Sequence, residues 1–255
     1  MHLSLTATML LLCATASAAA QEFRWHGRIA AGKAIEIKGV NGDVRAIAGS
    51  GETEVTAVKT ARRSDPAEVK IEVVEHSEGV TICAVYPSDG RRKNSCEAGE
   101  GGHMSTHDTD VQVHFTVRVP EAVRFVGKTV NGEVEAANLA SDVDVTTVNG
   151  SIRIATSGFA EATTVNGSIA ASMGRANWSD GVAFTTVNGG ITLDLPANLS
   201  TEVRASTVNG DIVSDFPLTV TGRFGPRRVS GTIGSGGRQL ALTTVNGNIK
   251  LRKAS

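Results

Sequence analysis

The sequence predicts an all-β protein: a short β-solenoid of about seven rungs, with an N-terminal β subdomain that caps it. A Thr-Val-Asn-Gly tetrapeptide recurs along the second half of the chain, and apolar residues alternate with polar ones on both sides of each copy. A helical periodicity is nowhere sustained. We assign residues 21–121 to the cap and residues 122–255, where the repeats lie, to the solenoid.

The first twenty residues have the layout of a secretory signal peptide. An apolar run over residues 3–14 is followed by Ala18-Ala19-Ala20, a small-residue cleavage site. This run is shorter than the roughly 20 residues of a transmembrane helix, and no later segment is long and apolar enough to be one. Cys13 would indicate a lipoprotein, but Leu12 precedes it where a small residue is expected. We therefore expect cleavage near Ala20 and a periplasmic or secreted, envelope-associated product.

The cap region begins with an outlying copy of the repeat. Residues 33–48 place Val-Asn-Gly between Ile35 and Ile37 on one side and Val44 and Ala46 on the other. Strand-like runs follow at residues 54–58, 70–76, 79–86 and 110–120. A solenoid needs such a cap because its open end is a sheet edge that invites aggregation.

Two cysteines, Cys83 and Cys96, lie beyond the signal peptide. An even pair in an exported protein predicts a disulfide, which would close a polar loop. In the chain-entropy model a loop of this size stabilises by about 3 kcal/mol. The alternative is a pair of free thiols.

The repeated tetrapeptide defines units of similar length. Its asparagines are Asn131, Asn149, Asn166, Asn188, Asn209 and Asn246. The last interval is about twice the others, and in its middle Ser230 lies in Val-Ser-Gly-Thr-Ile, which we interpret as a degenerate copy. With Ser230 included, the intervals are 18, 17, 22, 21, 21 and 16 residues.

Each unit contains two strands that meet at the tetrapeptide. Apolar residues lie six and four positions before the Asn, and three and often five positions after it; around Asn149 they are Val143, Val145, Ile152 and Ile154. Each side therefore has one buried face, and the alternation slips by one residue across Asn-Gly.

An antiparallel meander and a β-solenoid both fit this pattern. A meander needs only Asn-Gly at its hairpins, and its successive turns on one edge lie about 10 Å apart. A solenoid stacks equivalent residues at about 4.8 Å, so that identical side chains form ladders. Repetition of Thr and Val favours the solenoid. The asparagines are then expected to form a structural ladder, because each amide can donate to one rung and accept from the other.

Composition and motifs argue against several other functions. The net charge is −1, which does not suit nucleic-acid binding, and aromatic residues make up only 4% of the chain. The sequence has no nucleophile elbow, Walker loop or zinc-protease motif. The Thr of the tetrapeptide has the parity of the buried residues, so an ice-binding Thr array is not expected. Carboxylates scatter over different offsets from the Asn: Glu133, Glu135, Asp142, Asp144, Asp194 and Asp211.

The histidines do not predict a metal site. His103, His107 and Asp108 include an H-x3-H spacing, which aligns ligands on a helix, but the surrounding residues are Gly, Ser, Thr and Asp. We interpret this stretch as a solvated loop. His76 and His114 lie at outward strand positions.

The signal peptide, the β cap and the Thr-Val-Asn-Gly-x-Ile rungs resemble the bacterial "putative adhesin" domain family of unknown function. That family is related to bactofilin-like and autotransporter-adhesin-like β-helical domains. The resemblance covers about Phe23 to Leu251 and depends on Thr129–Gly132 and its copies, together with Ile35–Val44. It implies a β-helical fold and no catalytic residues.

We therefore expect an exported, non-catalytic, adhesin-like scaffold or surface-binding protein. Its expected partner is a protein or glycan surface, or another copy of itself, and neither a cofactor nor a nucleic acid is expected. The alternative is a polysaccharide-active β-helix enzyme of the envelope. Convergence of three or more charged side chains in one groove would favour that alternative.

Overall fold

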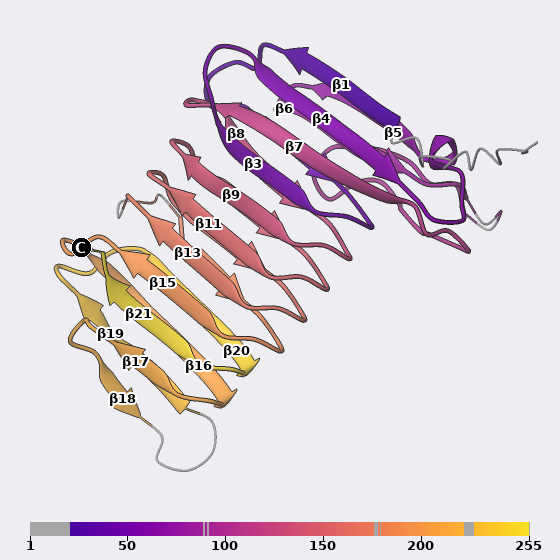
Figure 1. Ribbon diagram of the computed structural model, residues 1–255. Coiled ribbons are helices and arrows are strands. Elements are labelled where there is room, and N and C mark those ends of the chain that lie inside the picture. The colour runs from indigo at the N-terminus through magenta and orange to yellow at the C-terminus, as the bar shows by residue number, and fades with distance from the viewer. Residues whose placement is uncertain are drawn as a thin grey trace, which may run out of the picture.

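The computed structural model describes residues 21–88, 90, 92–175, 178, 180–221 and 227–254. The predicted signal peptide lies outside these residues. The described chain is all-β, as predicted, with one short 3-10 turn, η1 (Pro66–Glu68), and its strands form two sheets that face each other along an elongated stack (Figure 1). Within these residues no helix is long and apolar enough to cross a membrane.

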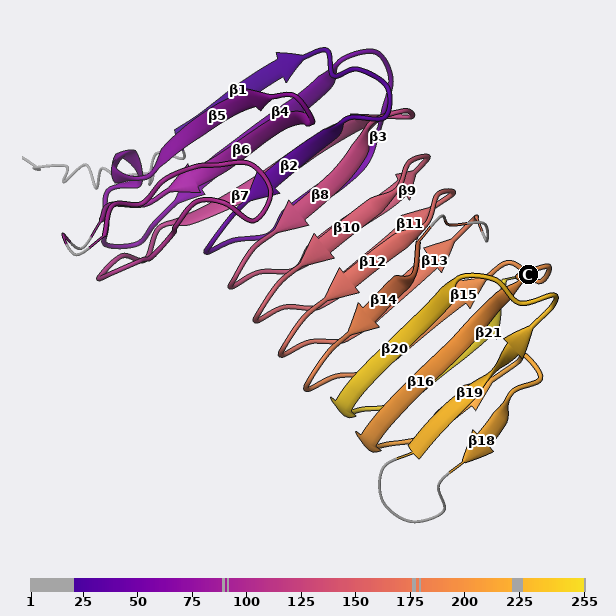
Figure 2. The same ribbon diagram turned by 180° about the vertical axis from the view of Figure 1, so that it is seen from behind.

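The middle of the stack consists of units that each give one strand to each sheet (Figure 2). The two strands of a unit follow each other in the chain and lie in different sheets. In chain order the units are β8 (Arg124–Lys128) and β9 (Val134–Leu139), β10 (Val143–Thr146) and β11 (Ile152–Thr156), β12 (Ala160–Thr163) and β13 (Ile169–Met173), and β14 (Val182–Thr185) and β15 (Ile191–Leu195).

Successive units pair in parallel and in the register of the repeat. Val145 lies beside Ala162 in one sheet, and Ile152 lies beside Ile169 in the other. Each tetrapeptide is thus a corner at which the chain passes from one sheet to the other. Parallel pairing rules out the antiparallel meander, whose neighbouring strands would run in opposite directions.

The N-terminal end of the stack combines parallel and antiparallel pairing. Strands β2 (Ala34–Lys38) and β3 (Val44–Gly49) lie in parallel beside β8 and β9, and β6 (Gly79–Val85) and β7 (Gln112–Pro120) lie in parallel beyond them. The outermost strands are antiparallel: β5 (Lys70–His76) pairs with β6, β4 (Thr53–Thr60) with β7, and β1 (Gln21–Gly27) with β4.

The C-terminal end departs from the expected order of rungs. Strands β16 (Thr201–Asn209) and β17 (Ile212–Ser214) do not lie beside β14 and β15. Strands β20 (Gln239–Asn246) and β21 (Ile249–Lys253) occupy the place between them, and pair in parallel on both sides. The unit of β16 and β17 is therefore separated from that of β14 and β15 by one unit, and the last two strands of the chain occupy the position between them.

The interpretation of Ser230 as a further rung is wrong. Ser230 lies in β19 (Arg227–Ile233), which pairs antiparallel with β16, while β18 (Thr219–Thr221) pairs antiparallel with β19. The physical reason is that β18 and β19 form a hairpin that covers the outer edge of β16. Such a hairpin shields an edge that would otherwise present unpaired backbone groups.

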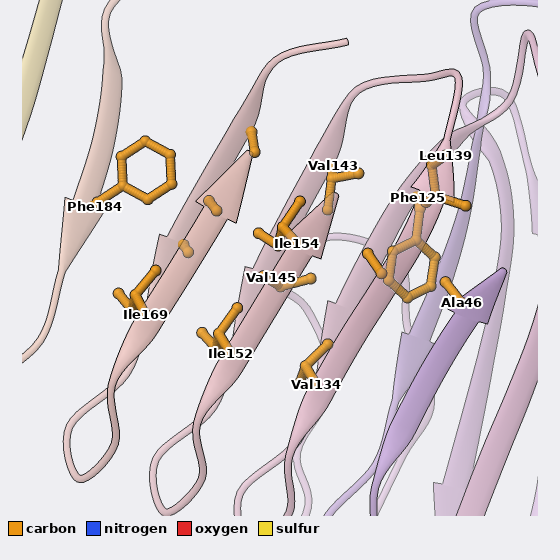
Figure 3. Close-up of a cluster of buried hydrophobic side chains, with 14 of the residues drawn as sticks. Ala46, Phe125, Val134, Leu139, Val143, Val145, Ile152, Ile154, Ile169 and Phe184 are labelled. Atoms are coloured by element: carbon orange, nitrogen blue, oxygen red, sulfur yellow. The ribbon is translucent and has the colours of Figure 1, made fainter. Parts of the chain in front are cut away.

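One continuous apolar core fills the space between the two sheets. It is built from alternate residues of each strand, and Phe125, Val145, Ile152 and Phe184 are among its buried members (Figure 3). Because this core occupies the inward positions of the described strands, the polar and exposed groups of these strands lie on the outer faces, at the corners and at the two ends.

Candidate functional site

The corners formed by the tetrapeptides lie in a row along one side of the stack. The Thr at the start of each tetrapeptide is buried, with an exposed fraction of 4% or less. Its hydroxyl donates a hydrogen bond to the carbonyl of the Gly of the neighbouring corner: Thr147 to Gly132 at 2.9 Å, and Thr186 to Gly167 at 2.8 Å. These hydroxyls satisfy corner carbonyls that the sheets leave unpaired.

The Asn side chains form a second row. Each Nδ2 donates to the Oδ1 of the preceding Asn in the stack at 2.7–2.8 Å, along the order Asn41, Asn131, Asn149, Asn166, Asn188, Asn246 and Asn209. Asn41, which belongs to the outlying copy in the sequence, is therefore the first member. Asn246 precedes Asn209 because β20 lies between β14 and β16.

The Gly of each corner is required by close approach of neighbouring backbones. A Cβ on Gly167 would lie 2.0 Å from the carbonyl oxygen of Gly150, and a Cβ on Gly150 would lie 1.9 Å from that of Gly132. No side chain fits there, so the repeated Gly is fixed by stacking and not by turn conformation alone.

The Val of each tetrapeptide points outward. Val130, Val148, Val165, Val187 and Val245 are 36–37% exposed and Val208 is 45% exposed, although valine is among the residues most often fully buried. We call these six valines, with the Asn that follows each of them, the Val–Asn ridge. Sequence reasoning missed it, although its signal was present: Val comes one residue after the buried Thr and so has outward parity.

The middle of the Val–Asn ridge is flanked by small neutral side chains. On the side of β10, β12 and β14 the neighbouring outward residues are Thr146, Thr163 and Thr185; on the opposite side Ser151 and Ser168 follow the corner glycines. In the part of the chain that the structure describes, the charged residues directly beside the ridge are Lys128, Glu133 and Asp211, which lie near its ends. The ridge therefore offers methyl groups and amides at regular spacing, with no charge in its middle.

A small carboxylate groove lies on the outer face of the sheet that contains β10 and β12. Its volume is about 110 Å³, and its charged lining residues are Arg124, Asp142, Asp144 and Glu161. Asp144 and Glu161 are direct neighbours across the parallel pair. Partial desolvation by the surrounding chain raises the pKa of Asp144, and desolvation together with the charge of Asp144 raises the pKa of Glu161.

Two of these carboxylates already have structural partners. Asp142 accepts a hydrogen bond from the backbone N–H of Phe159 at 3.2 Å, and Glu161 accepts one from Ala183 at 3.2 Å. Of the remaining carboxylates singled out in the sequence, Glu133 pairs with Arg153, Glu135 with Arg45, and Asp211 with Arg227. Of the carboxylates singled out in the sequence, Asp142 and Asp144 line the groove, together with Glu161, and the others lie outside it.

A long loop between β6 and β7 covers part of the same outer face. Cys83 and Cys96 are joined by a disulfide, with 5.7 Å between their Cα atoms. The Lys38 ammonium donates to three loop carbonyls, those of Glu97, Gly99 and Gly101, at 2.6–3.0 Å. Burial lowers the pKa of Lys38. The loop is thus held both by a disulfide and by a partly buried ammonium group.

The histidines of this loop do not converge. The backbone of His103 pairs with Ser95, whereas His107 lies 3.1 Å from the carboxylate of its neighbour Asp108 in an exposed position. Among the described residues no three His, Cys, Asp or Glu side chains are placed to hold a metal ion. His76 bonds Thr81, and His114 lies 3.4 Å from Asp43.

Comparison with known proteins places these features in one family. A family model described as "Toastrack DUF4097" matches residues 32–252. A solved "putative cell adhesion protein" from Clostridium sporogenes ATCC 15579 is similar over 92% of this chain and 100% of its own, with 11% identity and a TM-score of 0.47. A "putative adhesin" from Bacteroides fragilis NCTC 9343 is similar over 90% and 96%, with 13% identity and a TM-score of 0.37. No curated protein matches the chain.

Proposed function

The chain belongs to the Toastrack DUF4097 family, and from this premise we propose that it acts by surface contact, as a non-catalytic, adhesin-like protein of the cell envelope. The observation that carries the proposal is the Val–Asn ridge. Its six valines run over a length of about 24 Å at the spacing of neighbouring strands. A contiguous row of exposed apolar side chains with a polar surround is typical of an interaction surface.

The chemistry of the ridge indicates what it contacts. Methyl groups offer apolar area, and each Asn amide keeps one N–H and one oxygen lone pair beyond those used in the row. A partner therefore needs a flat, elongated and uncharged face. We propose a protein or glycan surface, or a second copy of this chain, as that partner.

We also propose export, with cleavage near Ala20 and a periplasmic or secreted product. The disulfide between Cys83 and Cys96 supports this, because such bonds persist in oxidising compartments. In this proposal residues 122–255 carry the solenoid with its structural Asn ladder, and residues 21–121 serve as the N-terminal cap. The antiparallel strands β1, β4 and β5 at that end support the capping role.

The test compares two threonine variants in pull-downs from envelope extracts and in sedimentation velocity. Val148→Thr combined with Val165→Thr and Val187→Thr keeps the shape of the ridge but replaces three methyl groups by hydroxyls. Val213→Thr, at a 56% exposed position away from the ridge, is the matched control. We expect the triple variant to lose binding or self-association and the control to keep it. Equal binding by both variants would show that the Val–Asn ridge is not the contact surface.

A second candidate function, cleavage of a polysaccharide, is favoured by the carboxylate groove. Asp144 and Glu161 are neighbours with raised pKa values, a pattern that glycoside hydrolases use for acid and base roles. The assay is release of reducing ends from envelope and plant polysaccharides by the wild type, Asp144→Asn and Glu161→Gln. We expect no turnover by any of the three proteins. Turnover by the wild type that both substitutions abolish would show that the chain is instead a polysaccharide-cleaving enzyme.

A further inference from the structure

The two sheets end unevenly at the N-terminal end of the stack. Beyond β3 one sheet continues through β7, β4 and β1, whereas beyond β2 the other continues only through β6 and β5. Strand β1 therefore extends past the last strand of the opposite sheet, and lies at the extreme end of the molecule (Figures 1 and 2). Its inward residues Phe23 and Trp25 are only half-buried for this reason.

A cavity of about 330 Å³ lies beside this overhanging strand. Trp25 and Ile29 line it from β1 and the segment that follows, and Glu75, His76 and Ser77 line it from the hairpin between β5 and β6. The cavity reaches the lower end of the volume range of small-molecule sites in proteins. It is separate from both the Val–Asn ridge and the carboxylate groove. We call it the terminal pocket.

Trp25 is positioned as an aromatic platform. A Cβ on Gly27 would lie 2.7 Å from the indole ring, so the absence of a side chain there allows the ring to lie against the strand. In the described part of the chain the indole N–H donates to no protein acceptor. The ring thus combines an apolar face with a free donor, the property that makes Trp common at binding surfaces.

Glu75 supplies an acceptor in the same pocket. It follows Ile71 and Val73 at alternate positions of β5, and so has the parity of that strand's inward face. Among the described residues no donor binds its carboxylate. A carboxylate can accept several hydrogen bonds at once, which suits a ligand with neighbouring hydroxyl groups.

The charges around the pocket nearly cancel. Lys33 pairs with Glu78 at 3.2 Å, and Arg28 and His26 both pair with Glu52, at 3.4 Å and 3.3 Å. Lys33 and Arg28 are thus paired, and among the described residues that line the pocket the charged group without an ion-pair partner is the Glu75 carboxylate. An anionic ligand is therefore disfavoured, and a neutral polyhydroxyl ligand is favoured.

We propose that the terminal pocket binds one sugar unit of a neutral glycan, with Trp25 against the apolar face of the sugar ring and Glu75 accepting hydrogen bonds from its hydroxyls. The volume admits a single sugar-sized group, and the open end of the stack lets the rest of the glycan extend into solvent. This site does not depend on the Val–Asn ridge.

The test uses the fluorescence of Trp25. The second tryptophan, Trp178, is 5% exposed in the core, so Trp178→Phe leaves Trp25 as the only tryptophan. This variant is titrated with cellotetraose, maltotetraose, chitotetraose and, as the acidic probe, tetragalacturonate. We expect a saturable change in emission with at least one neutral oligosaccharide and none with the acidic one. No saturable change with any neutral probe, or a response to the acidic probe alone, would overturn the proposal.

Two further substitutions identify the groups that bind. In the Trp178→Phe background, Glu75→Gln should weaken binding about tenfold, because a hydrogen bond to a charged acceptor is lost. The matched control Glu121→Gln should leave binding unchanged. In the otherwise wild-type protein, Trp25→Ala should weaken binding measured by calorimetry about tenfold, with the circular dichroism spectrum retained. A folded Trp25→Ala protein with undiminished affinity would exclude the platform. Ridge variants that lose their partner but still bind sugar separate this site from the proposed function.

Discussion

At the scale of single residues, the four members of the tetrapeptide meet different neighbours. The Thr hydroxyl donates to the Gly carbonyl of a neighbouring corner, and the Asn side chain bonds the Asn side chain of a neighbouring corner. The Gly allows the backbone of a neighbouring corner to approach closely, and the Val side chain faces solvent. Substitutions at the four positions should therefore affect the protein in different ways. Only at the Val position do we expect binding to change without stability.

Position in the Asn row should decide the cost of losing an amide. The side chain of Asn188 bonds those of both Asn166 and Asn246, whereas among the described residues of the row the side chain of Asn209 has one neighbour, Asn246. We expect Asn188→Ala to lower the free energy of unfolding by about 1–3 kcal/mol, and Asn209→Ala to lower it by less. Urea unfolding followed by circular dichroism measures both. Equal losses at the two sites would mean that the row does not act through its pairwise bonds.

Asp144 should make stability depend on pH. Its pKa is raised in the folded protein, so the folded state disfavours the ionised carboxyl, and stability is lost as the pH rises through the folded pKa. Below the unfolded pKa of about 3.9 the effect is absent. We expect Asp144→Asn to stabilise at pH 7, by less than about 1 kcal/mol because solvent screens the group, and to have no effect at pH 3. Melting temperatures at the two pH values test this, and a stabilisation that persists at pH 3 would contradict it.

At the scale of the structural elements, each corner depends on close contact between backbones. Gly167→Ala would place a methyl group 2.0 Å from the Gly150 carbonyl oxygen, so the two units would have to separate. We expect a loss of about 3 kcal/mol or more.

Gly181→Ala is the matched control for this substitution, because the nearest atom to its Cβ lies 3.5 Å away, in ordinary contact. We expect a change within about 0.5 kcal/mol for the control. Chemical denaturation measures both variants. Similar stability of the two proteins would show that the corners can relax without cost.

The sequence predicts the elements better than their order. Alternation around Asn149 locates β10 and β11, and identical residues predict parallel stacking because only equivalent positions then lie side by side. The order at the C-terminal end could not be predicted, since pairing of β20 with β14 joins Asn188 to Asn246 across 58 residues and no local pattern encodes that contact. The doubled interval before Asn246 signals that the regular repeat is interrupted there, but it does not say which strands become neighbours. The terminal pocket was equally hidden, because it depends on the unequal extension of two sheets.

At the scale of the whole molecule, the last unit in the chain holds the stack together. Strands β20 and β21 have neighbours on both sides, whereas β1 has a neighbour on one side only. Residues 201–233 contact the rest of the stack through β20 and β21, so they can join it only when residues 239–253 are paired with β14 and β15. Such long-range contacts slow folding, because loop closure precedes their formation.

Two truncations test this role. Removal of residues 239–254 should leave two unpaired edges that face each other across a gap, and we expect aggregation or rapid proteolysis of residues 182–233. Removal of residues 21–28 takes away a strand that is paired on one side, and the remaining protein should still fold. Limited proteolysis and size-exclusion chromatography measure both outcomes. A stable, monomeric protein that lacks residues 239–254 would contradict the inserted role of this unit.

The one-way order of the Asn row has a consequence for the electrostatics of the molecule. Every side-chain amide donates in the direction of Asn41 and accepts from the direction of Asn209. Aligned amide dipoles add, as they do along an α-helix, and bonded chains of them polarise one another. The row therefore carries partial positive charge at its Asn41 end and partial negative charge at its Asn209 end. A protein with a net charge of only −1 thus carries a dipole along the Asn row. Two copies that met end to end would favour head-to-tail contact, because the positive end of one row would then face the negative end of the other.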